Sequence, residues 1–356
     1  MGNRKQSRIP MRPKVYPDVI QKPKPIVTSL LDEMIEGREY QSIIDVQVQN
    51  IDLVSELKRA LDEISVIRHR PIVCYIGNVF NQGLTASNSI DFTDNLPFSE
   101  MLDSIDPKEN NIDIVLITPG GSGEQVASFV SLLRPRFESV CFILPSMCMS
   151  AGTILCLSGD ELIMDSRAFI GPIDPQVHTK DGSWVPAQSI ITLLEKIREK
   201  GEESIKKGIN PDWTDLQILV HLDAKEIGNA YNASEFSTKL VEEHLWKYKF
   251  KNWITRSSTG NLVTDEDRKR RAREIAVQLC DHSKWLSHSR GISRDAVVSE
   301  CRLQITKPED VPGLHRSIRR FEALVTYFCE RTGIIKLYVS NGYQLLRIDT
   351  NAVKPR

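Results

Sequence analysis

Ser150 is predicted to lie between a strand and a helix, because the apolar residues 140–144 precede it and a run of small residues follows it. A serine at a helix N-terminus lies in a field that favours negative charge. A second apolar run, residues 112–118, leads into the glycine pair Gly120 and Gly121, which exposes bare backbone N–H groups. A hydroxyl and such N–H groups are the nucleophile and the oxyanion hole that acyl transfer needs.

These two turns belong to an alternation of strands and helices. Apolar runs predict strands at residues 71–77, 112–118, 140–144, 161–164 and 168–170. Helical spacing predicts helices at residues 52–68, 98–105, 124–133 and 150–157. Uninterrupted apolar strands that alternate with helices indicate an α/β fold with a parallel sheet covered on both faces. Ligands collect at the carboxyl ends of such strands, so Gly121 and Ser150 should share one crevice.

The second half of the chain is predicted to be mainly helical. Helices are expected at residues 187–207, 213–227, 233–248 and 265–280. Residues 336–347 indicate a β-hairpin with a type I′ turn at Asn341 and Gly342, which tolerate positive φ. The predicted regions are a disordered basic arm over residues 1–45, a core with trailing helices over 46–255, and a helical extension ending in a hairpin over 256–356.

The composition limits the partners that we expect. A formal net charge of −1 argues against nucleic acid as the main partner, since phosphate binding needs a basic excess. Seven cysteines, several in apolar surroundings, fit reduced core thiols and a cytoplasmic protein. Neither a Cys-x-x-Cys nor a His-x-x-x-His spacing occurs, so we expect no metal and no cofactor. Nothing in the sequence indicates membrane association.

The motifs together carry a family resemblance. Residues 71–175, with Pro-Gly-Gly at their centre, resemble the Clp protease/crotonase superfamily. Residues 146–153 (Ser-Met-Cys-Met-Ser-Ala-Gly-Thr) and 171–176 (Gly-Pro-Ile-Asp-Pro-Gln) look like the serine dehydrogenase proteinase family, which is related to signal peptide peptidases. Residues 281–290 are also similar to a segment of that family.

The resemblance implies a crotonase-like spiral of ββα units that usually oligomerises. It assigns Ser150 as the nucleophile and the N–H groups of Gly121 and Ala151 as the oxyanion hole. The same serine could instead be an ordinary helix N-cap. The candidate substrate contacts are Gly120, Ser122, Met149 and Asp174. Asp174 could line the crevice or orient a partner, but Ile-Asp-Pro is equally typical of a turn.

The general base is not evident from the sequence. In Clp-type relatives a histidine follows the strand that here ends at Gly171, and in Ser–Lys relatives a lysine occupies the place of Gln188. Imidazole ordinarily titrates near neutral pH, whereas lysine needs burial to act as a base. The substitutes within the sequence are His178, Lys180 and Lys196. His282 and His288 are six residues apart, which does not place them on one helical face, and we expect them in a packed structural segment.

These observations favour a serine peptidase-like hydrolase that forms an acyl-enzyme on Ser150. We expect a peptide or protein substrate bound in extended form along the sheet edge near Gly121, and a homo-oligomeric enzyme. Two alternatives stay open. The missing base would suit a scaffold or interaction protein that has lost catalysis. Paired N–H groups would also suit an acyl-CoA enzyme that polarises a thioester carbonyl.

Overall fold

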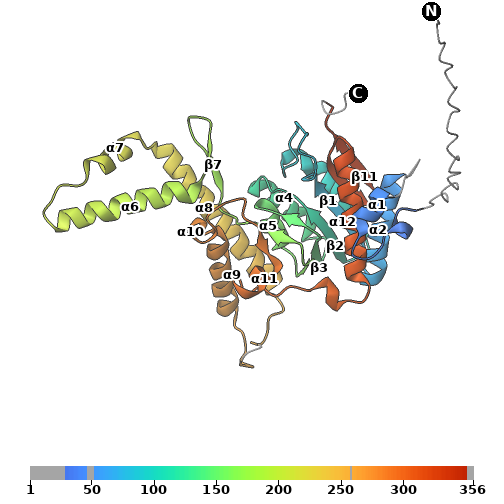
Figure 1. The fold of residues 1–356 in the computed structure, drawn as a ribbon. Helices are drawn as coiled ribbons and strands as arrows, with labels where there is room; N and C mark the ends of the chain where they lie inside the picture. The colour runs from blue at the N-terminus through green and yellow to red at the C-terminus, as the bar shows by residue number, and fades with distance from the viewer. Residues whose placement is uncertain (1–28, 46–51, 257–258, 351–356) are drawn as a thin grey trace, which may run out of the picture.

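A six-stranded sheet forms the centre of the molecule in the computed structural model, which describes residues 29–45, 52–256 and 259–350 (Figure 1). Its strands are β1 (Ile72–Gly77), β2 (Asn111–Ile117), β3 (Ser139–Leu144), β5 (Glu161–Met164), β10 (Ile334–Ser340) and β11 (Gln344–Ile348). They lie in the order β11-β10-β1-β2-β3-β5. The run from β1 to β5 is parallel, and β10 and β11 extend it in antiparallel pairing. The predicted parallel sheet is thus confirmed.

Helices cover both faces of this sheet. The first face is covered by α3 (Asn95–Asp103), α4 (Gly123–Leu133) and α5 (Ala151–Cys156). The second face is covered by α1 (Glu39–Asp45), α2 (Leu53–Arg68) and α12 (Leu314–Arg331). Because side chains alternate along a strand, Val73 and Tyr75 of β1 pack on the first face, whereas Ile72 and Cys74 pack on the second. The predicted α/β fold, with its sheet covered on both faces, is confirmed.

The N-terminal part of the chain is more ordered than its composition predicts. Leu30 is fully buried, and the Glu56 carboxylate accepts hydrogen bonds from the Ser29 hydroxyl at 2.8 Å and the Leu30 N–H at 2.9 Å. A short apolar stretch bonded to one buried carboxylate therefore orders residues 29–45, where the prediction of disorder is wrong. Residues 1–28 of the predicted arm lie outside the described residues.

The C-terminal hairpin forms as predicted, but its turn does not. Neither Asn341 nor Gly342 has a positive φ, so the turn is not of type I′. The loop is closed by a 2.9 Å hydrogen bond from the Ser340 N–H to the Tyr343 carbonyl. Since β10 pairs with β1, the hairpin extends the central sheet instead of standing apart from it.

Three helices form an arm that projects away from the sheet (Figure 1). They are α6 (Ala187–Lys206), α7 (Trp213–His221) and α8 (Ala224–His244). The predicted break near residue 230 is wrong, because the chain breaks at Asp223, whose carboxylate caps α8 by accepting the Lys225 N–H at 2.7 Å. The last turns of α8 return to the core, where Val241 and Leu245 are fully buried.

Smaller elements complete the wall near the strand ends. The helices are α9 (Asp265–Cys280), α10 (His282–Trp285) and α11 (Arg294–Ser299). The short strands are β4 (Met147–Cys148), β6 (Phe169–Ile170), β7 (Gln176–His178), β8 (Trp184–Pro186) and β9 (Ile292–Ser293). Within the residues described, none of the helices combines the length and apolar character needed to cross a bilayer.

Candidate active site

Ser150 lies at a sharp turn between β4 and α5. Its backbone has φ 50° and ψ −119°, a conformation that residues with a side chain rarely adopt. Its hydroxyl does not cap α5 and has no hydrogen-bond partner among the described residues. A conformation of this kind costs of the order of 1–3 kcal/mol and is typical of functional sites. The simple N-cap interpretation of Ser150 therefore has no support in the geometry.

The glycine pair packs directly against this turn. Gly120 has φ 106°, and a Cβ added there would lie 2.7 Å from the Ser150 Cβ and 2.8 Å from the Met149 carbonyl oxygen. Gly121 has φ 142°, and its Cβ would lie 2.2 Å from the Ile90 carbonyl oxygen. Both positions require glycine, because the space of a side chain is already filled by backbone or by the serine itself.

Two backbone N–H groups near the serine are left without partners. In the described part of the chain, neither the Gly121 nor the Ala151 N–H makes a hydrogen bond, whereas the Gly120 N–H donates to the Thr118 hydroxyl at 3.1 Å. Gly121, Ala151 and Ser150 all line one cavity of about 940 Å³. Unpaired donors beside a hydroxyl can stabilise an oxyanion.

One edge of the glycine turn is already occupied by the chain itself. The Ile90 N–H donates to the Gly120 carbonyl at 2.7 Å, and the Ser122 N–H donates to the Ile90 carbonyl at 2.9 Å. In such a parallel bridge the N–H and C=O of the middle residue, Gly121, face the opposite edge. Only that second edge of Gly121 is left free by the Ile90 bridge.

Of the other predicted site residues, some line the cavity that contains Ser150 and others do not. Ser122 lines the cavity and also caps α4, with its hydroxyl accepting the Gln125 N–H at 3.1 Å. Gly120 and Met149 are buried and do not line the cavity. Lys196 is exposed on the arm helix α6 and does not line it either.

The two positions at which the resemblance leads us to expect a base hold Gly171 and Gln188 here. A Cβ at Gly171 would lie 2.7 Å from the Met149 Cε and 3.0 Å from the Ser150 nitrogen, so a histidine there would require Met149 and its neighbours to shift. His178 is exposed on β7 and lines the cavity, with its ring edge-on to Trp184 at 5.2 Å between centroids. Lys180 is exposed in the β7–β8 loop and does not line the cavity.

Asp174, which was expected to contact substrate or to orient a partner, does not line the cavity. Its side chain is fully buried, and its two oxygens contact the Nδ1 atoms of His288 at 2.8 Å and His282 at 3.0 Å. His288 also lines the cavity that contains Ser150. The two histidines meet because Leu286, with φ 64°, ends α10 and turns the chain back. Two rings six residues apart would lie on different faces of one continuous helix. Residues 282–288 do not form such a helix, because α10 ends at Trp285.

The buried groups behind the serine turn are held neutral. Burial raises the pKa of the Cys148 thiol well above its ordinary value, which fits a core thiol and not a nucleophile. Burial also lowers the pKa of His244 to about 4, and the neutral ring contacts the Ile154 carbonyl of α5 through Nδ1 at 3.1 Å. All seven cysteines are free and buried.

The α/β sheet thus places an elbow serine and a glycine pair together at its strand ends. A model of the ClpP-like SDH-type serine proteinase family matches residues 40–265, so the chain belongs to this family. The predicted resemblance is thus confirmed.

Individual relatives are distant. The chain is 28% identical over 235 residues to the uncharacterized protein MJ0137 of Methanocaldococcus jannaschii, which covers 63% of this chain and 78% of that one. It is 27% identical over 212 residues to MJ1495 of the same organism, covering 59% of this chain and 63% of the other. It is also similar to the ClpP protease catalytic domain from Plasmodium falciparum, with 16% identity, coverage of 38% and 67%, and a TM-score of 0.25.

Proposed function

We propose that this protein is a serine peptidase that cleaves peptide bonds through an acyl-enzyme on Ser150. The observation that supports it most is the meeting of three unsatisfied groups in one cavity: the Ser150 hydroxyl and the N–H groups of Gly121 and Ala151. A tetrahedral intermediate needs a nucleophile and preorganised donors within reach of one carbonyl. Loss of one such donor typically costs about 3 kcal/mol of barrier stabilisation.

The substrate is a peptide or protein segment in extended form. It would lie along the free edge of the glycine turn, where main-chain hydrogen bonds give affinity whatever the side chains. The lining of the cavity includes the large apolar side chains of Ile173, Val177, Trp184 and Phe236, together with polar ones such as Asn229 and Asn232. We therefore expect a preference for apolar side chains next to the scissile bond.

A fluorophosphonate probe tests this function without a known substrate. The wild-type protein should be labelled on Ser150, and Ser150→Ala should not be labelled at all. Ser122→Ala is the matched control, since Ser122 lines the same cavity but its hydroxyl is engaged by the Gln125 N–H. Labelling that persists in Ser150→Ala, or a wild type that is never labelled, would remove the assignment.

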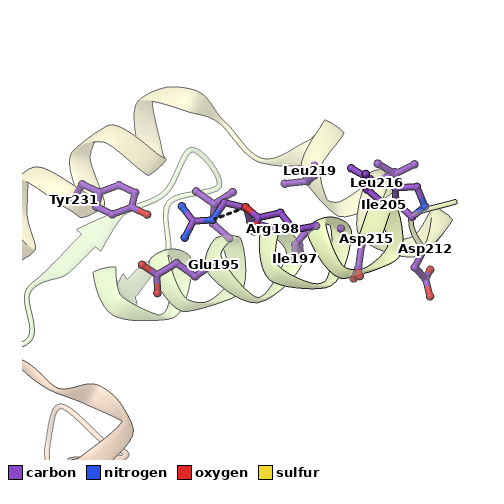
Figure 2. Close-up of a pocket in the computed structure, with 13 residues that line it drawn as sticks. Glu195, Ile197, Arg198, Ile205, Asp212, Asp215, Leu216, Leu219 and Tyr231 are labelled. Carbon is purple, nitrogen blue, oxygen red and sulfur yellow. Dashed lines mark ion pairs between the residues drawn. The ribbon is translucent and has the colours of Figure 1, made fainter. Parts of the chain in front are cut away.

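The arm suggests how copies of the chain assemble. Helix α7 has no buried residue although it is rich in apolar side chains, and Trp213 and Val220 are each 74% exposed. Figure 2 shows the adjoining hollow between α6 and α7, a cavity of about 450 Å³ that Ile197, Leu216 and Leu219 help to line. Exposed apolar patches of this kind mark interaction surfaces. A homo-oligomer in which a second copy covers the arm therefore forms part of the proposal.

A further inference from the structure

A second cavity, of about 860 Å³, lies at the amino end of β5, where Asp160 and Glu161 form part of its wall. The glycine turn after β2 lies at the opposite end of the parallel strands, so this cavity is separate from the one that contains Ser150. Its volume is within the range of small-molecule sites. The wall combines cationic and aromatic side chains, namely Lys249, Arg256, Arg271, Arg302, Phe250 and Trp253.

The carboxylates of this wall already have cationic partners. The pairs are Asp160 with Arg134, Glu161 with Arg68, and Glu274 with Arg271. Arg256 is likewise paired, with the Asp267 carboxylate at 2.7 Å. The negative charge of the wall is therefore compensated, and it uses the charge of only two of the four cations that line the cavity.

The other two cations of the wall have no carboxylate partner. The Lys249 Nζ donates only to the main-chain carbonyl of Asp160, at 3.4 Å. Within the part of the chain that the structure describes, the guanidinium of Arg302 makes no hydrogen bond and no ion pair. Burial lowers the pKa of Lys249, as expected for an ammonium group without a paired anion. An anion that entered the cavity would therefore meet two uncompensated positive charges.

The backbone holds these two cations in unusual local structures. Arg302 has φ 48°, in the left-handed region that residues with a side chain rarely adopt. The turn is fixed by Cys301, which is fully buried and whose carbonyl accepts a 2.7 Å hydrogen bond from the Arg271 guanidinium. Lys249 ends a π-helical turn, Leu245–Lys249, that continues α8. Strained residues and π-helical turns are both frequent at functional sites.

Charge and aromatic surface together indicate one class of ligand. Two uncompensated cations match a phosphate monoester, whose charge is close to −2 at neutral pH, whereas a carboxylate would compensate only one of them. The guanidinium group presents its donors in a fork that fits phosphate oxygens. Trp253 is partly buried, with Phe250 beside it at 5.7 Å between ring centroids. Aromatic side chains of this kind stack on nucleobases. We propose that this cavity binds a nucleoside phosphate, with the phosphate between Lys249 and Arg302 and the base against Trp253.

Equilibrium dialysis of the full chain with radiolabelled adenosine monophosphate tests the proposal. The wild type should bind one nucleotide per chain, and the affinity should fall as salt is added. Arg302→Gln and Lys249→Gln should each raise the dissociation constant by about tenfold or more, because each removes a charge-assisted contact to the phosphate. Arg302 is exposed, so its variant should keep the melting temperature of the wild type. Arg273→Gln is the matched control, since Arg273 is an exposed arginine of α9 outside the cavity.

Competition separates the phosphate from the base. Adenosine and inorganic phosphate should displace the labelled nucleotide only at concentrations about tenfold or more above that of unlabelled adenosine monophosphate. Trp253→Leu should weaken the nucleotide and leave inorganic phosphate unchanged. A wild type that binds no nucleotide, or Arg302→Gln and Lys249→Gln variants that bind it as tightly as the wild type, would overturn the site. Inorganic phosphate that competes as well as the nucleotide would overturn the nucleoside part. None of these measurements depends on Ser150, so they leave the proposed function untouched.

Discussion

The turn around Ser150 and the helical arm are built in opposite ways. At the turn, a Cβ on Gly120 would lie 2.7 Å from the Ser150 Cβ. The turn can therefore form only because residue 120 has no side chain. In the arm, a Cβ on Gly201 or Gly228 would meet nothing within 4 Å, and α7 buries no residue. The turn is tightly packed, whereas the arm leaves apolar surface exposed. The proposed chemistry and the proposed assembly therefore use separate parts of the fold.

The two parts meet along α8. Its first turns belong to the arm, its middle contributes Asn229, Asn232 and Phe236 to the wall of the serine cavity, and its end is buried in the core at Val241. If contact with a second copy of the chain moved the arm, the cavity wall formed by α8 should therefore move more than the turn at Ser150.

Gly120→Ala should produce the largest effect. The new methyl group clashes with Ser150 and the Met149 carbonyl, and φ 106° is strained for alanine. We expect the rate of Ser150 labelling to fall by about 10²–10³-fold, as for the loss of an oxyanion-hole donor. The melting temperature should also fall. A Gly120→Ala variant that is labelled as fast as the wild type would show that the turn accommodates the added methyl group. The turn would then not be more tightly packed than the arm.

His244, where α8 enters the core, should make stability depend on pH. Burial lowers its pKa to about 4, below the ordinary value of 6.5, so the unfolded chain takes up a proton that the folded protein refuses. Stability should therefore fall as pH drops from about 6.5 to 4, by about 3 kcal/mol in all. Urea unfolding at a series of pH values should show this slope in the wild type and lose it in His244→Gln. An equal slope in both proteins would contradict the assignment.

Val220→Asp should weaken self-association without unfolding the subunit. Val220 is 74% exposed in the single chain, so the substitution costs nothing there, but it places an unpaired charge in the proposed contact between copies. We expect the dissociation constant to rise by about tenfold or more, equivalent to about 1.4 kcal/mol. Sedimentation velocity over a concentration series measures this. Lys206→Asp, on the same arm, is the control. If Val220→Asp leaves the dissociation constant unchanged, the copies of the chain do not meet at this surface.

Gly201→Ala should have the smallest effect of these substitutions. It should raise the free energy of unfolding, whereas Gly120→Ala should lower it. Gly201 lies within α6 without a positive φ or a close neighbour, so alanine should stabilise the helix by roughly 0.5–1 kcal/mol. Thermal unfolding of the two alanine variants side by side gives the comparison. A loss of stability at Gly201 would mean that another surface packs closely there in the assembled protein.

Local signals were enough to predict the serine turn. The apolar runs before Gly120 and Ser150 are long and uninterrupted, and α2 begins at Asp52, whose carboxylate accepts the Val54 N–H at 3.0 Å. These features depend on residues close together in the sequence. The prediction of one crevice shared by Gly121 and Ser150 needed only the rule that parallel strands end at the same edge.

Features that depend on distant contacts were missed. Asp174 is more than a hundred residues from His288, so the contact between them could not be predicted from neighbouring residues. Residues 29–45 are ordered by the buried carboxylate of Glu56, which no composition reveals. In both cases one tertiary contact decides the outcome.

A crystal structure of the fluorophosphonate adduct tests the central claim most directly. We expect a covalent bond from phosphorus to the Ser150 oxygen, and a phosphonyl oxygen about 2.7–3.1 Å from the N–H nitrogens of both Gly121 and Ala151. An adduct on another residue, or a phosphonyl oxygen that faces solvent with both N–H groups unoccupied, would contradict the proposed chemistry.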